Sequence, residues 1–140
     1  MIWQLFTRRA GVEPRHILLG CLFSFAKHGH EEVSLPEVLD TVSEVQTTLP
    51  LGYEFSRDVH YSGQLFSDLT ELEESGYIRR YQYTHDGLLP KGYVALTMLG
   101  RGRAERTVEQ MTPPMAEVIN TAVQSAISRH ADYWRLYPRI

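Results

Sequence analysis

The stretch from Tyr61 to Thr97 constrains the fold more than any other part of the chain. Ser62 is a good helix N-cap, because its hydroxyl can accept a hydrogen bond from a free N–H of the first turn. A stripe of apolar residues at helical spacing follows it, made of Leu65, Phe66, Leu69 and Leu72. Gly76 suits the position just after a helix, where positive φ is needed. The pattern predicts a helix over 63–75.

A pair of strands is predicted directly after that helix. Residues 77–84 read as a first strand, and Asp86-Gly87 is a turn signal. Residues 92–97 read as the returning strand. The order of helix, strand, turn and strand therefore predicts an antiparallel hairpin that follows a helix.

Two helices are predicted upstream. Pro14 suits a first turn, and the run after it is apolar nearly all round, which predicts a buried central helix over 14–28. Ser34 and Glu37 have the spacing of a capping box and start a helix over 35–48. Its apolar stripe is Val38, Val42, Val45 and Leu49. In the link to Tyr61, Tyr53 and Phe55 alternate, so a short strand is one interpretation.

Two more helices are predicted downstream. Thr97 can cap a helix that runs to about Met111, with apolar positions roughly on one side at Leu99, Ala104, Val108 and Met111. Thr112 as cap and Pro113 in the first turn then start a helix over 113–136. Its apolar face comprises Met115, Val118, Ile119, Ala122, Val123, Ala126, Ile127 and Trp134.

These elements divide the chain into two parts. We expect a domain over 1–112, whose first residues form either a short helix or an edge strand. We expect residues 113–140 to form a C-terminal helix that packs on this domain or mediates a homodimer. A chain of 140 residues favours a single core.

Composition excludes several classes of protein. Cys21 is the only cysteine, so neither an internal disulfide nor a cysteine-based zinc site can form. No apolar run has transmembrane length, and the first residues lack the order of a signal peptide, so a cytoplasmic protein is expected. The net charge of -3 lacks the basic surplus of a strong nucleic-acid binder.

The chain resembles a family of bacterial regulators at several points. The matching positions are Tyr53-x-Phe55, Val59-His60-Tyr61-Ser62, Leu65, Leu69, Leu72 and Gly76-Tyr77-Ile78. They look like winged-helix proteins of the YwgA-like and Panacea-antitoxin kind. Tyr93 to Thr97, with Gly100, is similar to the end of the wing in such regulators. The resemblance spans roughly 14–111. It implies a mainly α, α+β winged helix-turn-helix fold with a two-stranded wing, an added C-terminal helix and a regulatory role.

No set of residues predicts catalysis or a cofactor. The cluster of His28, His30, Glu31 and Glu32 contains metal-ligating types, but no further ligand group stands out elsewhere, so a solvated loop is the favoured interpretation. Cys21 lies in the most apolar helix and is expected to be core. We therefore expect a non-enzymatic protein without a cofactor or metal.

The charges of the chain separate into two neighbouring stretches. Residues 61–78 contain Asp68, Glu71, Glu73 and Glu74 and no Lys or Arg. In the stretch 79–106 basic residues outnumber acidic ones. Because phosphate contacts dominate DNA affinity, these carboxylates would oppose docking on DNA if they faced the groove. The alternative is that the glutamates lie on the far, solvated side of the helix.

Two hypotheses follow about what the protein binds. The first is a protein-binding transcription regulator, for example a phage or bacterial factor that docks on RNA polymerase. Its expected contact residues include two adjacent apolar residues in the hairpin loop: Arg79, Arg80, Leu88, Leu89 and Lys91. The alternative is a repressor or antitoxin that binds double-stranded DNA. It would use Ser62, Gln64, Ser67, Arg79, Arg80 and Lys91.

Overall fold

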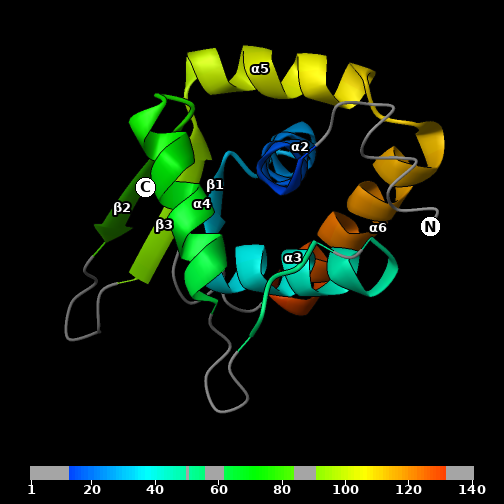
Figure 1. Cartoon of the computed structure of the whole chain (residues 1–140). Coiled ribbons are helices and arrows are strands. Elements are labelled where there is room, and N and C mark those ends of the chain that lie inside the picture. The colour runs from blue at the N-terminus through cyan, green and yellow to red at the C-terminus, as the bar shows by residue number, and fades with distance from the viewer. Residues whose placement is uncertain (1–12, 50, 56–61, 84–90, 132–140) are drawn as a thin grey trace.

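The computed structural model describes residues 13–49, 51–55, 62–83 and 91–131, and shows a mainly helical α+β fold (Figure 1). The elements follow in the order α2 (Pro14–Lys27), β1 (Glu32–Ser34), α3 (Leu35–Thr48), α4 (Gly63–Glu74), β2 (Ile78–Tyr83), β3 (Lys91–Leu96), α5 (Met98–Glu109) and α6 (Pro113–Arg129). The predicted helices and hairpin strands are confirmed to within a few residues. The first residues and the end of the predicted last helix, with Trp134, lie outside the described part.

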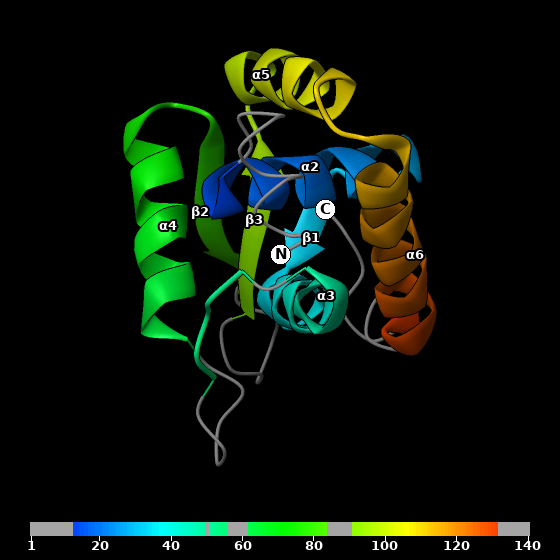
Figure 2. The ribbon, with the colours of Figure 1, turned by 45° about the vertical axis from the view of Figure 1, so that its right-hand side comes forward.

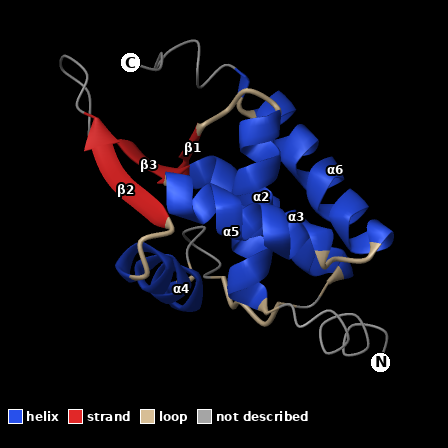
Figure 3. Ribbon diagram, turned by 90° about the horizontal axis from the view of Figure 1, so that it is seen from above, coloured by secondary structure: helices blue, strands red, loops and turns tan. Residues whose placement is uncertain are grey.

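The strands form one antiparallel sheet in the order β1-β3-β2, at one side of the helices (Figure 3). β3 pairs antiparallel with β2, as predicted, and Tyr81 lies opposite Tyr93. Its other edge pairs with β1, where Val33 lies opposite Val94. The sequence analysis did not predict β1, because three residues are too few to show an alternating pattern. The segment 51–55 is not a strand.

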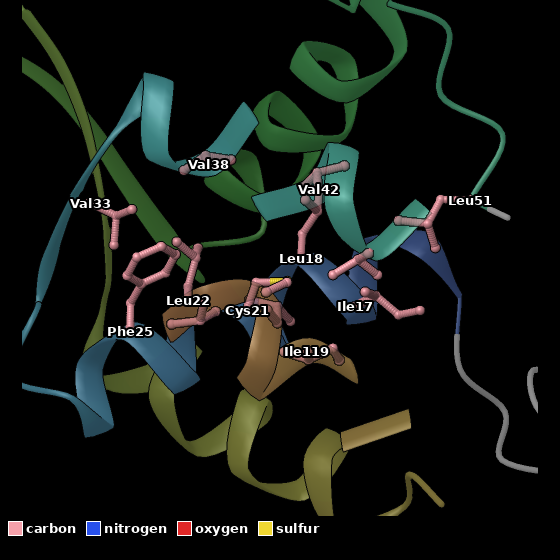
Figure 4. Packing of buried hydrophobic residues seen from close by; sticks show 14 of the residues in the cluster. Ile17, Leu18, Cys21, Leu22, Phe25, Val33, Val38, Val42, Leu51 and Ile119 are labelled. Carbon is pink, nitrogen blue, oxygen red and sulfur yellow. The ribbon is translucent and has the colours of Figure 1, made fainter. Parts of the chain in front are cut away.

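The predicted central helix is confirmed. α2 packs against α3, α4, α5 and α6 and against β1 and β3. Figure 4 shows the side chains that α2 directs into the core, with Val33 approaching from β1 and Val42 from α3. Phe25, at the sheet end of α2, is fully buried. A helix enclosed in this way must be apolar nearly all round, as its sequence is.

The capping patterns of α3 and α4 are formed as predicted. The Ser34 hydroxyl accepts a hydrogen bond from the Glu37 N–H at 3.3 Å, and the Glu37 carboxylate accepts from the Ser34 N–H at 3.1 Å. The stripe of α3 is buried at Val38, Val42, Val45 and Leu49. At the end of α4, Gly76 has φ 82°, and the Tyr77 N–H donates to the Leu72 carbonyl. This is the glycine-terminated helix end that the sequence indicates.

The expected apolar side of α5 is wrong at its first position. Leu99 is 58% exposed, whereas Gly100, Ala104 and Thr107 face inward. The reason lies in the contact between α5 and the start of the hairpin. A Cβ built on Gly100 would overlap with the Tyr77 carbonyl oxygen, so the glycine allows the two backbones to touch. Apolar spacing alone does not indicate this contact, because a glycine adds no apolar side chain to the stripe.

α6 packs against α2 and α3 and stands upright beside them in Figure 2. Its buried residues are Met115, Ile119, Ala122, Val123 and Ala126. The helix begins at Pro113, but the expected threonine cap is not made, since the Thr112 hydroxyl is buried without a hydrogen-bond partner. A contact of α6 with a second copy stays a prediction. Within the described ranges, no helix combines the length and apolar character needed to cross a membrane.

Candidate functional site

α4 stands beside β2 at one end of the molecule (Figure 2), and its exposed residues are polar or small. Its inner stripe of Leu65, Leu69 and Leu72 is buried. The exposed residues are Gly63, Gln64, Ser67, Glu71 and Glu74. This face carries no positive side chain, so its surface chemistry is neutral to acidic.

The first half of α4 is hydrogen-bonded to the segment 51–55. The Gln64 side-chain oxygen accepts from the Glu54 N–H at 3.2 Å. The Tyr53 hydroxyl donates a short hydrogen bond to the Asp68 carboxylate. Burial, reinforced by this carboxylate, raises the pKa of Tyr53 well above its ordinary value, so the phenol stays a donor. The backbone of Tyr53 also bonds to the side-chain amide of Gln46 in α3. The Tyr53 N–H donates to Gln46 Oε1, and the Tyr53 carbonyl accepts from Gln46 Nε2.

The acidic residues of α4 are partly neutralised within the chain. Glu71 forms an ion pair with Arg15 of α2 at 3.0 Å. Glu73 forms one with Arg80 of β2 at 2.8 Å. Glu74 is exposed and forms no ion pair within the described residues. Three of the four acids are therefore structural links from α4 to its neighbours, counting the Asp68 hydrogen bond.

Arg80 is held on α4. Its Nε and Nη2 both donate to Glu73 Oε1, at 3.1 and 2.8 Å, and Nη2 also donates to the Thr70 hydroxyl at 3.0 Å. The Arg80 backbone N–H donates to Glu73 Oε2 at 3.1 Å. These hydrogen bonds lower the pKa of Glu73 below its ordinary value. An arginine committed in this way has few donors left for a ligand.

The structure separates the remaining expected contact residues. Arg79 is exposed and forms no ion pair with any residue that the structure describes. Gln64 and Ser67 are exposed on α4, whereas Ser62 is buried and its hydroxyl caps Leu65. Lys91 opens β3, and its side chain is outside the described part. Leu88 and Leu89 also lie outside the described residues, so their contact role stays a prediction.

A groove of about 410 Å³ runs between α4 and the hairpin. Its lining residues are Leu35, Phe66, Glu73, Arg80, Tyr81, Gln82, Gly92 and Tyr93. Leu35 and Phe66 supply an apolar part, and both are half-buried. The Glu73–Arg80 pair lies on the wall of the groove. This volume is in the range of binding clefts in proteins.

Sequence reasoning missed an exposed methionine beside Arg79. Met98, the first residue of α5, is 92% exposed and lines a second hollow with Arg79 and Thr97. It lies outside the apolar stripe expected for α5, so helical spacing gave no signal for it. Arg79 and Met98 thus form a cationic and apolar corner at the start of the hairpin.

The other candidate residues have structural partners. His28 contacts the Ser24 carbonyl at 2.8 Å and Gln124 at 3.2 Å, and Glu31 pairs with Arg101 at 3.0 Å. Among the described residues, no three potential metal ligands lie together. Cys21 is part of the core, and burial raises the pKa of its thiol to about 12. The thiol is therefore protonated and unreactive at neutral pH.

Comparison with known proteins identifies no relative of this chain. No family model, no curated protein and no solved structure matches the chain.

Proposed function

We propose that this chain is a winged helix-turn-helix module, and that it is a non-enzymatic transcription regulator that acts by binding a protein. The element order supports the fold. A helix, a short strand and two further helices precede the β2–β3 hairpin, and β1 pairs with the returning strand. In such a module α4 occupies the place of the recognition helix and the hairpin is the wing. α5 and α6 are additions that pack on α2.

The charge of α4 favours a protein partner over DNA. The exposed face of this helix has Glu71 and Glu74 and no cation. Arg80, the nearest arginine on the wing, is occupied by Glu73. DNA binding requires cations that neutralise phosphates, and each absent contact removes part of the affinity. A protein partner needs apolar and arginine anchors instead, and Arg79 with the adjacent leucines of the wing loop would supply them.

Double-stranded DNA remains the second candidate because of two residues at the start of α4. Gln64 and Ser67 are exposed on the face that would enter a major groove. A glutamine can read adenine, and a serine can contact phosphate. With Arg80 committed, Arg79 and Lys91 would have to supply the wing's phosphate contacts.

The test compares two variants in two assays. Leu88→Asp with Leu89→Asp changes the apolar loop pair, and Arg79→Ala removes the exposed cation. Each is assayed for DNA binding by gel shift at low and physiological salt, and for capture of a transcription-machinery protein, with RNA polymerase as the first probe. Arg106→Ala is the matched control, since Arg106 is an exposed arginine on α5 without an ion pair in the described ranges.

We expect both wing variants to lose protein capture while the control keeps it. Sequence-selective DNA binding that survives physiological salt and ignores the leucine substitutions would overturn the proposal in favour of the DNA alternative.

A further inference from the structure

β2 is an edge strand of the sheet, and its outer edge faces the groove beside α4. The sheet order leaves β2 with one partner, β3. In an antiparallel pair, alternate residues direct their N–H and C=O groups toward the partner, and the others direct them away. The Thr97 N–H donates to the Tyr77 carbonyl, which sets this alternation. Arg79 and Tyr81 therefore bond to β3, while Arg80 and Gln82 direct their backbone groups outward.

The two outward residues differ in whether a side chain caps the backbone N–H. The Arg80 N–H is capped by the Glu73 carboxylate at 3.1 Å, which agrees with the alternation. Gln82 is exposed, and no side chain in the described part of the chain caps its N–H. Gln82 also lines the 410 Å³ groove, near its apolar part. An uncapped backbone donor and acceptor at a sheet edge are a template for another strand.

The side chains around this edge specify what strand would fit. Cross-strand neighbours share a face, so Arg79 lies on the face of Ala95, and Arg80 and Gln82 lie on the opposite face with Val94. A strand added beside β2 would direct alternate side chains to these two faces. One set would enter the groove toward Leu35 and Phe66, and the other would lie beside the cation of Arg79.

We propose that the edge of β2 at Gln82 binds an extended peptide segment that alternates apolar and acidic residues. The bound strand pairs its backbone with Gln82, places apolar side chains in the groove between α4 and β2, and places a carboxylate opposite Tyr81, diagonally across from Arg79 on the same face. This inference rests on the proposed function, since it names the kind of protein segment that the wing accepts. Glu73 sets the limit of the site, because its carboxylate already occupies the edge at Arg80.

The test titrates the full chain with a short capped peptide that alternates glutamate and valine, and follows backbone amides by NMR. The deciding variant is Gln82→Pro, which removes the outward N–H without removing a bond to β3. Proline is tolerated at such an edge position. Gln82→Ala is its matched control, because it removes the side chain but keeps the N–H.

We expect the peptide to shift the Gln82 amide and to slow its hydrogen exchange. Affinity should fall about tenfold in Gln82→Pro, by loss of a backbone hydrogen bond, and stay within about twofold in Gln82→Ala. Arg79→Ala should weaken the binding of this peptide. Replacing the glutamates of the peptide by lysines should abolish binding. An unshifted Gln82 amide, equal affinity for Gln82→Pro and wild type, or equal binding of the lysine peptide would each overturn the strand addition.

Failure of this inference is distinguishable from failure of the proposed function. If Gln82→Pro still captures RNA polymerase while Arg79→Ala does not, protein binding stands and strand addition at Gln82 is wrong. If neither polymerase nor the peptide binds but DNA does, the proposed function itself is wrong.

Discussion

The α2–α3–α6 region and the α4–β2 region are held together by different kinds of contact. Around α2 the contacts are mainly apolar, with Phe25, Ile119 and Val123 buried, and polar links such as Arg129 with Glu44 lie at the margin, between the end of α6 and α3. Around α4 an inner leucine stripe is supplemented by polar links to three other segments, through Tyr53, Arg15 and Arg80. Apolar contacts stabilise the fold most. The polar links occupy charged and hydrogen-bonding side chains. Fewer of these groups therefore remain on the surface to contact a partner.

The largest expected effect comes from the apolar region. Phe25→Ala should lower the free energy of unfolding by about 3–5 kcal/mol, because a fully buried aromatic side chain leaves a cavity. Chemical denaturation followed by circular dichroism measures this loss. The matched control is Phe23→Ala on the same helix, where the ring is only half-buried, and a smaller loss is expected there. Equal losses at the two positions would contradict the central place of Phe25.

An intermediate effect is expected where α4 meets the segment 51–55. Tyr53→Phe removes one hydroxyl donor and should cost about 1 kcal/mol, since Asp68 loses its partner but stays partly in water. Asp68→Ala in the Tyr53→Phe background should then add little, because the two groups act as a pair. Additive losses in this double-mutant cycle would show that the two side chains are not coupled.

The smallest effect is expected at the Glu73–Arg80 pair, which is partly exposed and so worth only about 0.2–1 kcal/mol. The pKa of Glu73 is lowered by folding, so its contribution to stability is present above the unfolded-state pKa and is lost as pH falls through the folded-state pKa. Glu73→Gln should therefore be less stable than wild type at neutral pH, and the difference should vanish in acid. A difference that stays constant with pH would exclude the ion pair as its source.

Glu73→Gln also sharpens the comparison between the two regions. It releases the Arg80 guanidinium, and salt-dependent DNA affinity should then rise relative to wild type. A matching substitution at another exposed ion pair, Glu31→Gln, releases Arg101 of α5 and should not have this effect.

The two regions also differ in how far sequence predicts them. The helices around α2 follow from apolar spacing and local caps such as Ser34 with Glu37, which join residues close in the chain. The links of α4 join residues on different elements, and Arg15 with Glu71 lie far apart in the chain. Spacing rules carry no information on such pairs. The acidity of α4 could thus be predicted, but not that Arg80 would be withdrawn from the surface. β1 and the close approach at Gly100 were missed because neither leaves a periodic apolar pattern.

Gly100 has a consequence for tracing the ancestry of this chain. Because the Tyr77 carbonyl fills the space where a Cβ would lie, every other amino acid at position 100 should be rejected in a saturation mutagenesis screen for folding. Gly102, two residues further along α5, has nothing within 4 Å of a built Cβ and should accept most residues. A glycine three residues after a threonine that caps the helix following a strand is therefore a diagnostic position. Distant homologues that have lost all other similarity should still retain it, together with the carbonyl contact that demands it.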